Sequence, residues 1–158
     1  MGRVFFNTRE NIHELTDSTY QVLASDSGKT FVLNSTSAMT VTLPADADIS
    51  EGWNCRFYVK TANDNAYTIK CSDVTDSTGQ MFEGGIAVAS TTAGFGHAVA
   101  AAANDSQIVF DGNLANGAGE PGTHVEIFKS ASKKFAISGF CISDDADTDG
   151  SAILSNAS

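Results

Sequence analysis

Hydrophobic and polar residues alternate with a period of two along most of this chain, and turn-forming residues separate the alternating runs. Successive side chains of a β-strand point to opposite faces, so such runs predict strands that bury one face. The clearest run covers 53–61, where Trp53, Cys55, Phe57 and Val59 share a face. The pattern therefore predicts a β-rich fold.

The runs also predict which strands pair. Strands are expected at 19–25, 30–34, 38–43, 53–61, 67–71, 107–110, 124–129 and 134–143. The first three indicate a meander. The next two indicate a hairpin that would place Cys55 and Cys71 on the same sheet face, and the last two indicate a second hairpin.

The remaining segments give weaker patterns. Residues 84–104 are rich in small side chains without a clean period, and their alanines leave a short helix open, although Gly94 and Gly96 disfavour it. Residues 45–52 read as a polar connection with one helical turn, and 113–122 as a loop. No internal repeat of solenoid length is visible.

Short strands with turns every few residues are typical of a β-sandwich or small barrel. We expect an all-β, jelly-roll-like β-sandwich over 19–143. A short N-terminal arm would precede it at 1–18, and an acidic C-terminal tail would follow at 144–158. The 158 residues match the size of one domain.

The arm contains five large apolar side chains, Val4, Phe5, Phe6, Ile12 and Leu15, in a polar stretch. Three roles stay open for it. It grips a partner lattice, it packs on its own domain, or Thr8–Leu15 forms a short helix that covers one end.

Composition narrows the choice of partners. Nine Lys and Arg face nineteen Asp and Glu, a formal charge of −10. Such a field repels phosphate backbones and anionic lipids, so neither nucleic acid nor a membrane is expected as a partner. The first residues lack the apolar stretch of a signal peptide, so a soluble chain made in the cytosol is expected.

No residue pattern indicates catalysis or a cofactor. The three cysteines, Cys55, Cys71 and Cys141, lie in apolar runs without CxxC spacing and are expected to be reduced and buried. His13, His97 and His124 belong to no nucleophile or metal signature. We therefore expect a protein that is not an enzyme, with no catalytic or cofactor-binding residues.

One motif has the spacing of a calcium loop. Asp145, Asp147 and Asp149 precede Gly150 as DxDxDG, but the loop's twelfth position is Asn156 rather than Glu. Helical flanks are also missing. An exposed acidic terminus explains the string, and no metal site is expected.

Two segments together carry a family resemblance. Residues 28–69, GKTFVLNSTSAMTVTLPADADISEGWNCRFYVKTANDNAYTI, and 121–140, PGTHVEIFKSASKKFAISGF, resemble small β-rich virion proteins of tailed bacteriophages, especially marine ones. The resemblance covers roughly residues 20–142. Thr123 stands where these proteins commonly have Asp, and Phe135 where they commonly have Trp.

The resemblance implies a capsid decoration (cement) protein or a part of a tail or fibre, usually a homotrimer. The leading expectation is a decoration protein on the outer capsid surface, assembled in the host cytoplasm, whose partners are the major capsid protein and its own copies. The alternative is a receptor- or glycan-binding module of a tail fibre, which exposed Trp and Tyr would favour. Trp53, at a strand start, is instead expected inside. A polysaccharide depolymerase would require paired carboxylates in a groove.

The first prediction concerns metal. Because the DxDxDG string lacks its bidentate Glu, adding a chelator is expected to leave the melting temperature unchanged within error. Differential scanning calorimetry measures this directly. A clear fall in melting temperature that calcium reverses would instead assign Asp145, Asp147 and Asp149 to a site.

Overall fold

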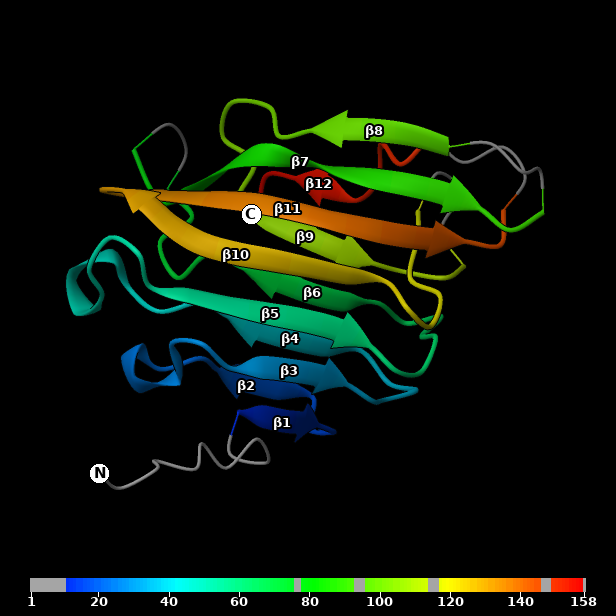
Figure 1. The fold of residues 1–158 in the computed structure, drawn as a ribbon, viewed down its shortest axis with the longest axis horizontal. Coiled ribbons are helices and arrows are strands. Elements are labelled where there is room, and N and C mark those ends of the chain that lie inside the picture. The colour runs from blue at the N-terminus through cyan, green and yellow to red at the C-terminus, as the bar shows by residue number, and fades with distance from the viewer. Residues whose placement is uncertain (1–10, 76–77, 93–95, 114–116, 146–148, 158) are drawn as a thin grey trace, which may run out of the picture.

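The computed structural model describes residues 11–75, 78–92, 96–113, 117–145 and 149–157, which form two β-sheets packed face to face (Figure 1). The larger sheet contains, in spatial order, β1 (Ile12–Leu15), β3 (Thr30–Leu33), β5 (Asn54–Val59), β10 (His124–Ala131), β11 (Lys134–Ser143), β7 (Met81–Ser90) and β8 (Gly96–Ala100). The smaller contains β12 (Leu154–Ser155), β9 (Gln107–Phe110), β6 (Tyr67–Lys70), β4 (Met39–Thr42) and β2 (Thr19–Gln21). The predicted all-β sandwich is confirmed.

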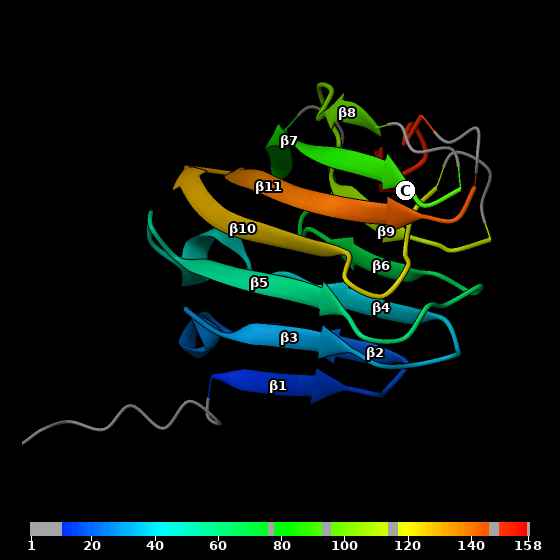
Figure 2. The ribbon, with the colours of Figure 1, turned by 45° about the vertical axis from the view of Figure 1, so that its right-hand side comes forward.

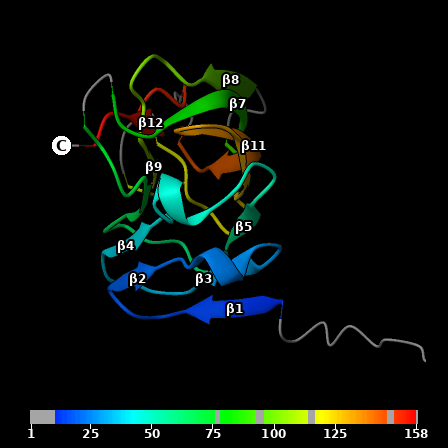
Figure 3. The ribbon, with the colours of Figure 1, turned by 90° about the vertical axis from the view of Figure 1, so that its left-hand side faces the viewer.

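The first six strands form a parallel coil rather than a meander and a hairpin. Successive strands alternate between the two sheets, so β1, β3 and β5 lie parallel in one sheet and β2, β4 and β6 lie parallel in the other (Figures 2 and 3). The predicted meander over 19–43 is therefore wrong. So is the predicted hairpin of 53–61 with 67–71, because β5 and β6 belong to different sheets.

The coil is held by rows of like side chains. Leu15, Leu33 and Val59 occupy one register position on β1, β3 and β5, and all three are buried. The Phe31 and Phe57 rings of adjacent strands stack with their centroids 5.3 Å apart. Stacking equivalent apolar residues on successive turns keeps one continuous core between the sheets.

Unequal turns hide this coil in the sequence. The register places Ile12 beside Thr30 and Thr30 beside Arg56, so one turn takes 18 residues and the next takes 26. A repeat search depends on a fixed period, and this chain has none. Cys55 lies on β5 and Cys71 directly follows β6 of the other sheet, and both side chains are buried in the shared core.

The second half of the chain adds mainly antiparallel strands. β10 and β11 form the predicted hairpin, and β10 also pairs antiparallel with β5. Residues 84–104 contribute to β7 and β8, an antiparallel pair, instead of a helix. Their outward positions hold Ala and Gly where a polar residue would have revealed the alternation. The jelly-roll topology is not confirmed, because jelly rolls are antiparallel and this sandwich contains several parallel pairs.

The predicted N-terminal arm, 1–18, extends too far into the chain. Residues 12–15 are strand β1, which pairs with β3, and Leu15 is 3% exposed in the core. The short helix left open for Thr8–Leu15 is likewise wrong for residues 12–15, because they form a strand. Val4, Phe5 and Phe6 lie outside the described residues.

The C-terminal segment is part of the domain instead of a tail. β12 pairs with β9 at the edge of the smaller sheet, and the Ile153 and Leu154 side chains are buried. The Ser106 hydroxyl accepts a hydrogen bond from the Ala157 N–H at 2.9 Å. Apolar residues after the acidic string therefore complete the core at the end of the sandwich.

A buried lysine fastens one connection to the sheet. Lys129 takes an inward position of β10, and its ammonium donates to the Asp46 and Ile49 carbonyl oxygens at 2.7 and 2.8 Å. It also pairs with the Asp46 carboxylate at 2.8 Å, which lowers the pKa of that group. The expected helical turn in 45–52 is present as a 3-10 turn, Asp46–Asp48, and this cation holds it in place.

The place of β1 in the fold can be tested by two substitutions on the same strand. Leu15→Ala removes a buried side chain and is expected to lower the free energy of unfolding by about 2–5 kcal/mol. Ile12→Ala, at a position 58% exposed, is expected to change it by less than about 0.5 kcal/mol. Urea titration followed by circular dichroism measures both. Equal effects of the two substitutions on the free energy of unfolding would contradict the burial of Leu15 in the core.

Candidate interaction face

The outward side of the seven-stranded sheet carries two long rows of side chains. Strand register aligns residues from neighbouring strands across this side, which we call the aromatic face. One row is Ile12, Thr30, Arg56, Glu126 and Ser138, and the next is Glu14, Val32, Tyr58, His124, Phe140, Ala87 and Ala98.

Large apolar side chains are exposed mainly on this face. Of five such residues among those described, four stand here: Ile12 at 58%, Phe128 at 48%, Tyr58 at 40% and Phe140 at 39% exposed. The fifth, Leu23, precedes a 3-10 turn outside the sheet. Apolar side chains that gather on one surface mark a contact site, whereas scattered ones need no explanation.

The charges on the aromatic face are paired. Arg56 of β5 pairs with Glu126 of β10, and both side chains are half exposed. Lys60 and Lys134 pair with carboxylates of β1 and β7, Glu14 at 3.0 Å and Glu83 at 3.5 Å. Each pair is worth little to stability in water, but together they leave the face electrically neutral.

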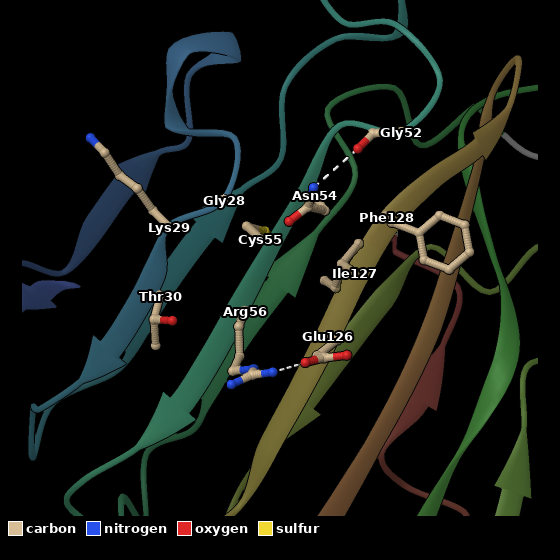
Figure 4. A pocket seen from close by; sticks show the side chains of 10 residues that line it. All are labelled: Gly28, Lys29, Thr30, Gly52, Asn54, Cys55, Arg56, Glu126, Ile127 and Phe128. Carbon is tan, nitrogen blue, oxygen red and sulfur yellow. Dashed lines mark hydrogen bonds and ion pairs between the residues drawn. The ribbon is translucent and has the colours of Figure 1, made fainter. Parts of the chain in front are cut away.

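Two shallow grooves meet at the central ion pair. One runs past Gly52, Asn54 and Phe128, the other past Tyr58, His124 and Phe140, and Arg56 and Glu126 line both. The first groove is drawn in Figure 4, where the Arg56 and Glu126 side chains point toward each other and the Phe128 ring lies farther along β10. They form one trough along β5 and β10 that can accept an extended or flat partner.

Backbone contacts shape the second groove. The His124 Nδ1 atom lies 3.1 Å from the Gly122 carbonyl oxygen, and the His124 and Phe140 rings are 6.4 Å apart. An added Cβ at Gly139 would collide with the His124 carbonyl oxygen. Glycine at that position therefore allows β11 to approach β10 closely.

The outward side of the smaller sheet has a different character. Thr19, Thr40 and Thr68 are aligned across β2, β4 and β6. The neighbouring row is polar throughout: Gln21, Thr42, Lys70, Gln107 and Ser155. Among the described residues, the exposed aromatic rings therefore lie on one of the two outward sides.

Carboxylates suited to glycoside hydrolysis are not paired in the trough. Glu126 is the carboxylate lining the two grooves, and Arg56 neutralises it. Elsewhere, the Glu120 and Asp64 carboxylates converge on Gly112. Burial, with the nearby Asp144 and Asp64 charges, raises the pKa of Glu120.

The residues singled out from the sequence are scattered. His13 packs beside the Tyr20 and Phe31 rings, at 5.3 and 6.1 Å, and His97 lies on β8. Within the described ranges, no group of three or more His, Cys, Asp or Glu side chains is placed to hold a metal ion. The Asp149 carboxylate accepts a hydrogen bond from the Ser151 N–H at 2.8 Å, while Asp147 lies outside the described residues.

Trp53 is buried, as predicted. It is 6% exposed, its indole N–H donates to the Ala24 carbonyl oxygen at 3.0 Å, and its ring meets that of Phe135 edge-on. The exposed aromatic residues are Tyr58, Phe128 and Phe140 instead. Their outward positions in the predicted strands were the available signal, but only strand register shows that they share a surface.

Comparisons with protein-family models, curated proteins and solved structures give no match. No helix in the described part of the chain is long and apolar enough to cross a membrane.

The predicted burial of the three thiols is confirmed, and their reactivity can be tested. Burial raises the pKa of Cys71 and Cys141 to about 12 and that of Cys55 still further. Because the thiolate is the reactive form, native labelling by a maleimide is expected to be slow. Three labels per chain are expected after unfolding, counted by mass spectrometry. Prompt labelling of the native protein would contradict the burial.

Proposed function

We propose that this chain is a non-catalytic structural protein of a bacteriophage virion. In this proposal it is a capsid decoration protein that binds the outer surface of the assembled shell as a homotrimer and stabilises it. Its partners are the major capsid protein and its own copies. The observation that carries a role in assembly is the aromatic face, while the assignment to a phage capsid rests on the family resemblance.

The surface favours assembly over chemistry. A broad, flat sheet side with exposed Tyr58, Phe128 and Phe140 rings suits contact with another folded surface. Small-molecule sites are usually concave and enclose their ligand. The charged side chains that line the trough are all engaged in ion pairs, Arg56 with Glu126 and Lys29 with Asp26, which leaves none as an obvious acid or base.

The proposed mechanism is stabilisation by mass action. A protein that binds only the assembled, expanded shell shifts the equilibrium towards that state. At a free concentration 100 times its dissociation constant, one site adds about 2.7 kcal/mol. Many sites on one shell multiply this effect, so a protein with no enzymatic activity can resist internal pressure.

A tail-fibre module that binds a glycan is the second candidate. One observation favours it: aromatic rings flank both ends of a trough whose centre holds the polar Arg56–Glu126 pair. Aromatic faces stack on apolar sugar faces while polar groups bind hydroxyls. Trp53, which is buried, cannot contribute to such a site.

The decoration proposal can be tested with shells that lack this protein. The purified chain is expected to co-sediment with expanded shells and to raise the temperature at which they break open. Unexpanded precursor shells are the matched control and are expected to bind at least about tenfold more weakly, a difference of about 1.4 kcal/mol.

Two results would contradict decoration. Failure of the purified chain to bind expanded shells would show that the capsid is not its partner. Saturable binding to host-surface polysaccharide, with no binding to shells, would instead establish the tail-fibre alternative.

A further inference from the structure

We propose that copies of this chain associate with one another through the aromatic face. The inference rests on the proposed homotrimer and deepens it by assigning the surface that joins the copies. The occupant of the face is therefore a second copy of this chain. Three observations carry it: the distribution of charge, the extent of the face, and the contrast between its two halves.

Charge disfavours self-association through the acidic surfaces of the molecule. The whole chain has a formal charge of −10, but the aromatic face holds three basic and three acidic groups, all paired. The acidic excess therefore belongs entirely to the rest of the molecule. Two copies that approach through any strongly acidic surface repel each other, whereas neutral faces can meet without that cost.

Taken as a whole, the face approaches the size of a specific interface. Seven strands spaced about 4.8 Å apart and about 20 Å long give roughly 600 Å² in projection, before side-chain relief is added. A typical specific interface takes about 800 Å² from each partner. Phe128, Tyr58 and Phe140 are the kind of rigid aromatic side chains that dominate such contacts.

The two halves of the face have complementary shapes. The half over β5, β10 and β11 carries the projecting aromatic rings. The half over β7 and β8 carries small outward residues, Gly85, Ala87, Ala98 and Ala100, beyond the Glu83 carboxylate that pairs with Lys134. Rings of one copy can lie on the flat half of another, so each copy offers both parts of the contact.

Charge substitutions test the inference. Arg56→Glu breaks the central pair and leaves two unpaired carboxylates on the face, so it is expected to weaken association at least about tenfold. The double variant Arg56→Glu with Glu126→Arg restores neutrality and is expected to return within about threefold of wild type. Lys70→Glu is the matched control, because it makes the same charge change on the other sheet.

Sedimentation equilibrium measures the dissociation constants, and the melting temperature of each variant checks its fold. Because Arg56 and Glu126 are half exposed, breaking their pair is expected to leave the monomer folded. Removing aromatic area by Phe128→Ser, or adding charge to the flat half by Ala98→Glu, is also expected to weaken association. An effect of only one of these two would overturn the contact between unlike halves.

Salt dependence supplies a second readout. Raising ionic strength from about 0.01 to about 0.15 M shortens the screening length from about 30 to about 8 Å. Repulsion between acidic copies then fades, so association through a neutral face is expected to strengthen. Association that weakens with salt would show an interface of opposite charges and would overturn the inference.

The inference and the proposed function fail separately. A wild-type chain that stays monomeric, or an Arg56→Glu variant that associates no worse than Lys70→Glu, overturns the inference even if shells are still bound. A chain that associates as expected but binds no shell leaves the inference intact and removes the decoration function.

Discussion

The structure depends on the burial of alternate side chains in one space shared by two sheets. In the coil, Leu15, Leu33 and Val59 form a row from one sheet, and the Phe31 and Phe57 rings stack beside it. Each strand alone would expose one apolar face. Crossing between the sheets after every strand gives all of them the same core, which explains why the coil is parallel and why its connections can vary in length.

Polar anchors hold these crossings in place. The Tyr67 hydroxyl accepts from the Ser35 N–H and lies 2.6 and 2.9 Å from the Ser35 and Thr61 carbonyl oxygens, which joins two connections to β6. Lys129 acts similarly on the turn at Asp46. Such buried groups are fully hydrogen-bonded, so they stabilise one arrangement of the coil over alternatives. The outward positions are thereby left available for contacts with partners.

The aromatic face follows from this arrangement. Register brings Tyr58, His124 and Phe140 into one row although they come from distant parts of the chain. Because ion pairs between neighbouring strands and their ends balance the charges there, the face is neutral on a strongly acidic protein. A surface of this kind favours a folded partner of matching shape. It therefore connects the fold to the proposed role in virion assembly.

The sequence by itself determined the β class, most strand positions, the buried thiols and the inward place of Trp53, because these depend on alternation within one strand. Strand pairing was decided only by the tertiary structure. Residues 53–61 and 67–71 read as a hairpin, yet alternation cannot tell whether the next strand returns beside its neighbour or crosses to the other sheet. The aromatic face was hidden for the same reason, since it exists only in the register between strands far apart in the chain.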